Sequence, residues 1–128
     1  MKALKISTDN EITIVDVEQP LYEGLRSIID GYLECVNPRG LPRPYVMIVD
    51  EEGLLKEKAM NLVGSVLYET FKHGSPIVGD IVIMREEHNY DGTDFAGLTA
   101  EDTEELTQLA REILEKTISW KGGEIDEI

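Results

Sequence analysis

The side chains best suited to bind an anion are two arginines in a proline-rich segment. Arg39 and Arg43 lie within residues 37–44, where three prolines exclude a helix or a central strand. Two guanidinium groups on a stiff loop favour bidentate bonds to a phosphate. With Tyr45 on the adjoining strand, they predict a site that binds or sequesters an anionic nucleotide. The competing interpretation pairs both arginines with surface carboxylates of this acidic chain.

The other reactive side chains do not form a catalytic motif. His73 and His88 are 15 residues apart, and neither has a serine or cysteine nucleophile motif beside it. The single cysteine, Cys35, lies beside apolar residues in an expected strand, which favours a buried and inert thiol. The glycine-rich patterns that cradle nucleotide phosphates are missing from the sequence. We therefore expect no enzyme and no catalytic residue.

Residues 86–94 hold the densest set of potential metal ligands. In a calcium loop that begins at Glu87, Asn89 and Asp91 occupy the third and fifth positions. The twelfth position requires a bidentate glutamate, and Leu98 stands there instead. We therefore expect neither a metal nor a cofactor, and predict a solvated acidic loop that precedes a helix.

Net charge is the strongest departure from an ordinary composition. The 128 residues include 26 acidic and 12 basic side chains, which gives −14 at pH 7. Residues 1–85 contribute −4 and residues 86–128 contribute −10. This balance disfavours direct binding to nucleic-acid backbones and to anionic membranes. The first ten residues lack the apolar run of a secretory signal, and no apolar stretch approaches the ~20 residues of a membrane span, so a cytoplasmic location is expected.

The acidic excess falls on an expected helix near the carboxyl end. Thr99 and Asp102 have the spacing of a capping box, with Asp in place of Glu or Gln. Apolar residues then recur at helical spacing on one stripe, namely Leu106, Leu109, Ala110, Ile113 and Leu114. The acidic residues that lie largely off this stripe are Glu101, Asp102, Glu104, Glu105, Glu112 and Glu115.

This acidic helix has two interpretations. Its carboxylates either keep the protein soluble or imitate a row of phosphates and occupy a basic groove on a partner. The only tryptophan, Trp120, either docks the end of the helix on the core or anchors a partner.

Hydrophobic periodicity predicts the elements that position these side chains. Residues 1–17 alternate as two strands of a hairpin, and Pro20 opens a short helix that Gly31 ends in a left-handed conformation. Residues 32–36 alternate as a third strand, and the continuous apolar run of residues 45–49 predicts a buried central strand. A helix from Asn61 to Phe71, a strand over residues 77–84 and the acidic helix follow. The pattern predicts one α+β domain over residues 1–118, with a mixed or antiparallel sheet of about five strands and three helices mainly on one face. Residues 119–128 are expected to be a frayed acidic tail.

Short blocks along the chain resemble a known family when they are taken in order. They are MKAL at residues 1–4, GYLE at 31–34, DEEGL at 50–54, NL at 61–62 with LY at 67–68, IVGDIV at 77–82, DF at 94–95 and LTAED at 98–102. Together they resemble the domain-of-unknown-function family 3846, small proteins of Gram-positive bacteria, their phages and their plasmids. The resemblance implies a phage or mobile-element setting, but it implies no activity and no catalytic residue. The proline-rich segment 37–44 and the residues after Lys116 have no counterpart in it.

These observations lead to one functional hypothesis and one alternative. We expect a non-catalytic accessory protein of a phage or mobile element that binds a host protein with a basic surface through the acidic helix. The alternative is the small-ligand site at Arg39, Arg43 and Tyr45. A homodimer through a strand edge, such as the hairpin of residues 1–17, is also expected to be possible.

Overall fold

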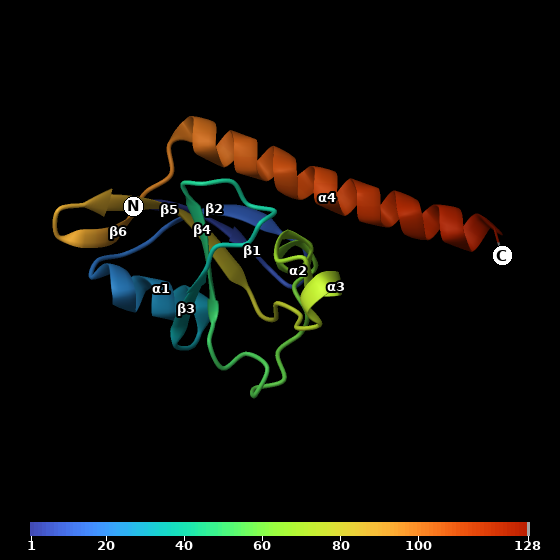
Figure 1. The fold of residues 1–128 in the computed structure, drawn as a ribbon, viewed down its shortest axis with the longest axis horizontal. Helices are drawn as coiled ribbons and strands as arrows, with labels where there is room; N and C mark the ends of the chain where they lie inside the picture. Colours follow the sequence, from blue (N-terminus) through green and yellow to red (C-terminus); the bar gives the residue numbers. More distant parts are fainter. Residues whose placement is uncertain (128) are drawn as a thin grey trace.

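The computed structural model describes the backbone of residues 1–127 and the side chains of residues 1–70, 72 and 74–117. In chain order the elements are β1 (Lys2–Ile6), β2 (Ile12–Asp16), α1 (Leu21–Ile29), β3 (Leu33–Val36), β4 (Tyr45–Asp50), α2 (Leu62–Leu67), α3 (Thr70–His73), β5 (Ile81–Asn89), β6 (Gly92–Ala96) and α4 (Ala100–Glu127). Figure 1 shows α4 lying across the domain and projecting beyond the sheet.

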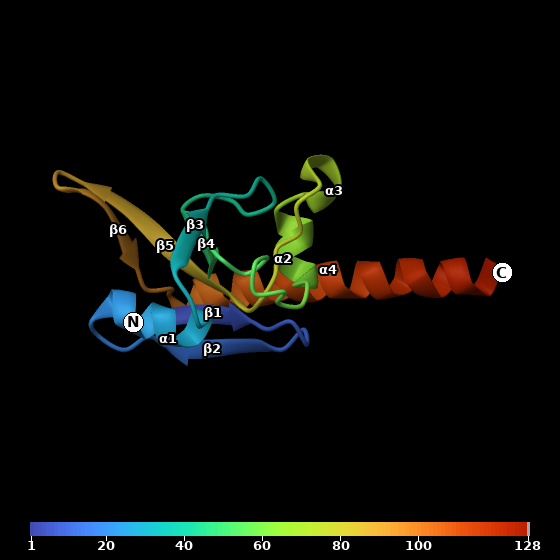
Figure 2. The same ribbon diagram turned by 90° about the horizontal axis from the view of Figure 1, so that it is seen from below.

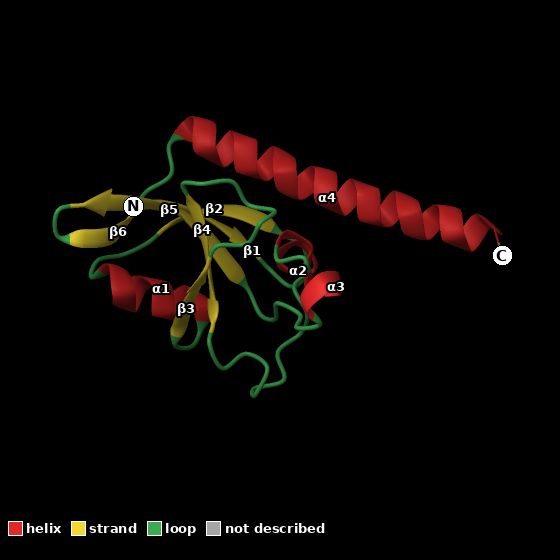
Figure 3. Cartoon of the chain, in the orientation of Figure 1, coloured by secondary structure: helices red, strands yellow, loops and turns green. Residues whose placement is uncertain are grey.

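The strands form one antiparallel sheet in the order β2-β1-β5-β4-β3. β5 lies at its centre and is the longest strand. Its first half pairs with β1 and its second half pairs with β6, so these two short strands lie on the same side of β5. On its other side, β5 pairs with β4 from Ile48↔Val82 to Tyr45↔Arg85. Figure 3 shows the strands in yellow, with helices on both sides of the sheet.

Alternation along the strands divides the core into two layers. All six residues of β4 are buried. Tyr45 and Met47 belong to the layer that packs under α4 and α2, whereas Val46 and Ile48 belong to the layer that packs under α1. The predicted α+β class is confirmed, and the sheet has six strands where about five were expected.

The additional strand lies in the segment that we expected to be an acidic loop. Residues 86–94 belong to the β5–β6 hairpin, in which Asn89 pairs with Gly92 across a turn formed by Tyr90 and Asp91. Gly92 has φ +123°, a conformation that other residues rarely adopt. The loop prediction is therefore wrong, because strand pairing satisfies the backbone of these polar residues.

Local geometry corrects three smaller expectations. Asp30, and not Gly31, adopts the left-handed conformation that ends α1. The helix that begins after Asn61 is interrupted where Glu69 has φ +58°, and α3 follows as a separate turn. Cys35 is in a strand, as expected, but it is exposed because β3 forms an edge of the sheet. Partial burial and the carboxylates of Glu86 and Glu34 raise the pKa of this thiol.

Candidate functional site

The first turn of α4 is fixed to the sheet by one carboxylate. Asp102 accepts two hydrogen bonds from Arg85 Nη1, at 2.9 Å and 3.0 Å, and one from the hydroxyl of Tyr45 at 2.7 Å. It also accepts from the amide of Thr99 at 2.8 Å, while the hydroxyl of Thr99 accepts from the amide of Asp102 at 3.1 Å. The predicted capping box is thus present, and Arg85 and Tyr45 extend it to neighbouring strands.

Electrostatics keep this carboxylate ionised. Burial opposes ionisation of Asp102, but the bonds from Thr99, Tyr45 and Arg85 outweigh it and lower its pKa to about 2. Burial and the carboxylates of Asp102 and Glu105 raise the pKa of Tyr45. Asp102 is only 7% exposed, and its carboxylate oxygens are hydrogen-bonded within the protein, so it cannot present its charge to a partner. We therefore remove Asp102 from the predicted partner-binding set.

The other predicted acidic residues of α4 form a continuous exposed surface. We call this set the acidic face; its members are Glu101, Glu104, Glu105, Glu112 and Glu115, all exposed. At 3.6 residues per turn they lie within about 100° of the helix circumference, opposite the apolar stripe. That stripe packs on the sheet through Leu106 and Ala110, so the acidic face is turned towards solvent. None of its members takes part in a salt bridge within the described side chains.

The two arginines of the proline-rich segment 37–44 lie on the surface. Both Arg39 and Arg43 are exposed, and neither has a salt bridge or a side-chain hydrogen bond among the described residues. The expected pairing with surface carboxylates is therefore not found in this part of the chain. Arg43 and Tyr45 line a hollow of about 100 Å³ that Arg39 does not reach. Typical ligand pockets measure ~300–1,000 Å³, so this hollow admits only a phosphate-sized group.

One histidine joins the same hollow. Nε2 of His88 lies 3.4 Å from Oε1 of Glu86, and Nδ1 lies 2.9 Å from the hydroxyl of Thr93. Glu86 and His88 both line the hollow beside Arg43. No sequence pattern predicts this grouping, because it depends on the pairing of β4 with β5. The side chains of His73 and Trp120 lie outside the described residues.

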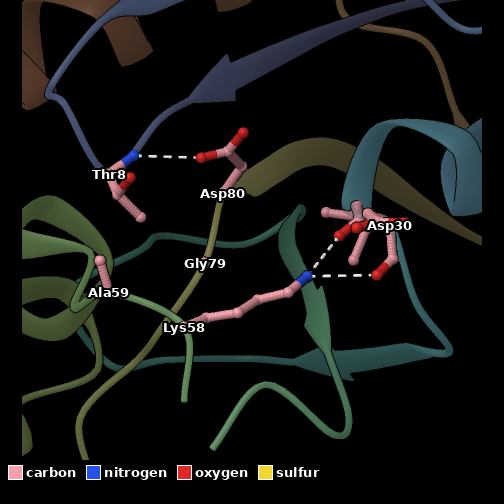
Figure 4. Close-up of a pocket in the computed structure, with 7 residues that line it drawn as sticks. Thr8, Asp30, Lys58, Ala59, Gly79 and Asp80 are labelled. Carbon is pink, nitrogen blue, oxygen red and sulfur yellow. Dashed lines mark hydrogen bonds between the residues drawn. The ribbon is translucent and has the colours of Figure 1, made fainter. Parts of the chain in front are cut away.

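A larger pocket of about 260 Å³ lies where the β1–β2 turn approaches the end of α1. Figure 4 shows Asp80 directed towards the amide of Thr8, at 3.1 Å, and Lys58 directed towards the end of α1. The ammonium group of Lys58 donates to the carbonyls of Ile29 and Asp30, at 2.9 Å and 3.2 Å. It also lies 2.7 Å from Asp50, so its hydrogen-bonding capacity is used within the protein. No sequence pattern predicted this pocket.

Asp50 connects the pocket to the core. Its side chain is fully buried and forms salt bridges with Lys56 Nζ, at 2.9 Å, and with Lys58. Burial opposes its ionisation, but the bonds from Lys58, Lys56 and the amide of Glu52 lower its pKa. Both lysines also donate hydrogen bonds to carbonyls at the end of α1. The cluster therefore caps the end of α1 and joins it to β4.

Neither a metal site nor a membrane span emerges from the described residues. In that part of the chain, no three His, Cys, Asp or Glu side chains lie close enough together to hold a metal ion. None of the described helices is long and apolar enough to cross a bilayer.

Comparison with known proteins gives one match. Neither a curated protein nor a solved structure is significantly similar to the chain. A family model, described as a domain of unknown function (DUF3846), matches residues 1–111, which include every strand, α1 to α3 and the first part of α4. The resemblance noted in the sequence is thereby confirmed, and the chain belongs to the DUF3846 family.

Proposed function

We propose that this chain is a non-catalytic accessory protein that binds a macromolecule with a basic surface through the acidic face of α4. One observation carries the proposal: five exposed carboxylates lie on one side of a helix and have no salt bridge among the described side chains. Arg111 and Lys116 lie beside the acidic face and not within it, as the helical spacing requires. The face therefore offers a row of negative charge about 20 Å long.

The anchoring of α4 makes this row a rigid surface. The Arg85–Asp102 pair and the capping box fix the amino end of the helix, and the apolar stripe fixes its rotation. A basic partner gains from a charge pattern that is already arranged, because less conformational entropy is lost on binding. Glu101 and Glu105 are a like-charged i,i+4 pair, and a bound cation relieves their repulsion. The family resemblance supports a phage or mobile-element setting, and we propose a host protein as the partner.

A pair of variants with equal charge tests the proposal. In the first, the five glutamates of the acidic face are replaced by glutamine. In the control, Glu11, Glu18, Glu23, Glu34 and Glu51 are replaced instead; they are exposed and lie outside α4. Each variant has five fewer negative charges, which changes the net charge from −14 to −9.

The partner is captured from a lysate of a Gram-positive host, purified, and titrated with each variant at low and high salt. We expect affinity to fall on the order of tenfold or more for the first variant and far less for the control. Binding of the parent chain should weaken as salt rises. Capture that ignores salt, or equal losses in the two variants, contradicts the proposal.

A second candidate is the binding of a small anionic group at the hollow beside Arg43. The guanidinium of Arg43 lies next to Tyr45 and has no salt bridge to a described side chain, which supports this candidate, whereas the carboxylate of Glu86 in the same hollow opposes it. Thermal unfolding with inorganic phosphate and with a nucleotide panel tests this candidate, with R43A as the comparison. A ligand at a hundred times its dissociation constant adds ~2.7 kcal/mol of stability. An unchanged melting temperature with every ligand rejects it.

A further inference from the structure

The outer edge of β2 is an open strand edge with an unusual composition. β2 ends the main strand order of the sheet, and Figure 2 shows it at the margin of the molecule with no element beyond it. Its sequence, ITIVD, contains no proline and no lysine, two residues that proteins use to block edge pairing. Ile14 is 54% exposed on this strand. The edge is therefore suited to pair with another strand.

Hydrogen bonds at both ends of the β1–β2 ladder show which groups are free. The amide of Ser7 donates to the carbonyl of Glu11, and the amide of Val17 donates to the carbonyl of Met1. In the register of this pair, Thr13 and Val15 are then the residues bonded to β1. The N–H and C=O groups of Ile12, Ile14 and Asp16 consequently point away from the sheet.

We propose that two copies of this chain pair through their β2 strands, antiparallel and centred on Ile14. In this register Ile14 faces Ile14 of the second copy, and Ile12 faces Asp16. Each strand has three outward residues, so all their outward N–H and C=O groups find partners in a two-fold arrangement. The two exposed Ile14 side chains then cover each other on the face that carries α4, since Ile14 lies opposite Leu4 of that core layer.

Charge favours a second copy at this edge over the other edges. The hairpin of residues 1–17 has two lysines against three acidic side chains, whereas the whole chain carries −14. Asp16, the only charged residue of β2, is paired with Lys2 at 2.7 Å. The edge strands β3 and β6 carry the exposed residues Glu34 and Asp94, which have no salt bridge among the described side chains. Repulsion between copies is therefore weakest at β2.

Sedimentation equilibrium of the full chain from micromolar to millimolar concentration tests the pairing. We expect the average mass to rise from 14.4 kDa towards twice that value, and to rise further with salt, because salt screens the repulsion between two acidic chains. This salt dependence is opposite to that expected for a basic partner at the acidic face, so the two proposals succeed or fail separately. A mass that stays at 14.4 kDa throughout overturns the dimer.

A matched pair of proline variants tests the edge. I14P removes an outward N–H and leaves the β1–β2 bonds intact. C35P makes the same change on β3, where the bond from Glu51 to Tyr32 and the β3–β4 register place the N–H of Cys35 outward. We expect I14P to abolish the dimer and C35P to leave it unchanged. Equal behaviour of the two variants rejects β2 as the interface.

Disulfide trapping tests the register without relying on proline. In a C35S background, I14C places two thiols at a directly opposed pair, within the ~4.4–6.8 Å between Cα atoms that a disulfide accepts. T13C places them two residues out of register. We expect oxidation to link I14C into a dimer at least tenfold faster than T13C. Equal rates contradict the register centred on Ile14.

Discussion

Arg85 holds both carboxylate oxygens of Asp102 through one guanidinium nitrogen, at 2.9 Å and 3.0 Å. The two residues belong to β5 and to the first turn of α4, so this contact fixes the helix that carries the acidic face. The same contact therefore stabilises the fold and holds the acidic face in position.

The Arg85–Asp102 pair predicts a loss of stability in acid. The pKa of Asp102 falls from its ordinary value of 3.8 to about 2 on folding, so the native state binds fewer protons than the unfolded state between these values. Its contribution, about 2–3 kcal/mol, is present above pH 4 and is lost as pH falls towards 2. Urea unfolding of D102N should show lower stability at pH 7 and a shallower decline in acid; part of the decline remains, since the pKa of Asp50 is also lowered. An unchanged acid profile would contradict this role.

Replacing Asn61 with Asp, a side chain of the same shape, is expected to lower the stability of the fold strongly. Its buried amide nitrogen donates to the carbonyls of Ile6 and Gly79, at 2.9 Å and 3.0 Å, while its oxygen accepts from the amide of Gly64. N61D keeps the helix cap but sets an oxygen against two carbonyls. We expect a loss of about 3–5 kcal/mol at pH 7. The loss should shrink in acid, because protonation removes the buried charge and restores one donor. N61S, which also keeps a cap acceptor, should cost less in the same measurement.

Any side chain added at Gly31 is expected to clash with its surroundings, although the backbone of Gly31 does not have a positive φ. A Cβ added there would lie 2.5 Å from the carboxylate of Asp50, which Lys56 and Lys58 hold in place. G31A should therefore cost about 1–3 kcal/mol of unfolding free energy. A double-mutant cycle with D50S checks the cause, since a shorter side chain at position 50 should recover part of the loss. If the losses of unfolding free energy from G31A and D50S simply add, the clash does not involve Asp50.

Local patterns predicted most elements, and long-range contacts account for what they missed. Alternation placed β1 and β2, a continuous apolar run placed β4, helical spacing of apolar residues placed α1, and capping residues placed the starts of α2 and α4. The β6 strand escaped because its residues are polar; Asp91-Gly92 was the available hairpin signal. The burial of Asp102 depends on Tyr45, 57 residues earlier, and no periodicity encodes that contact. The acidic face was predictable because it needs only the helical period and the side on which the apolar stripe lies.

The carboxylates of the acidic face are expected to contribute to partner binding and not to the stability of the fold. Because its five glutamates have no salt bridge among the described side chains, their replacement by glutamine should not destabilise the fold. Glutamine retains an acceptor for the two bonds that the face receives, from Tyr45 to Glu105 and from Gln108 to Glu112. Removing the like charges of Glu101 and Glu105 is mildly favourable. We therefore expect the melting temperature of the five-glutamine variant to stay within about 4 °C of the parent, a shift equivalent to less than ~1 kcal/mol. A much larger fall would show that these carboxylates support the fold, and any loss of partner binding would then have a structural cause.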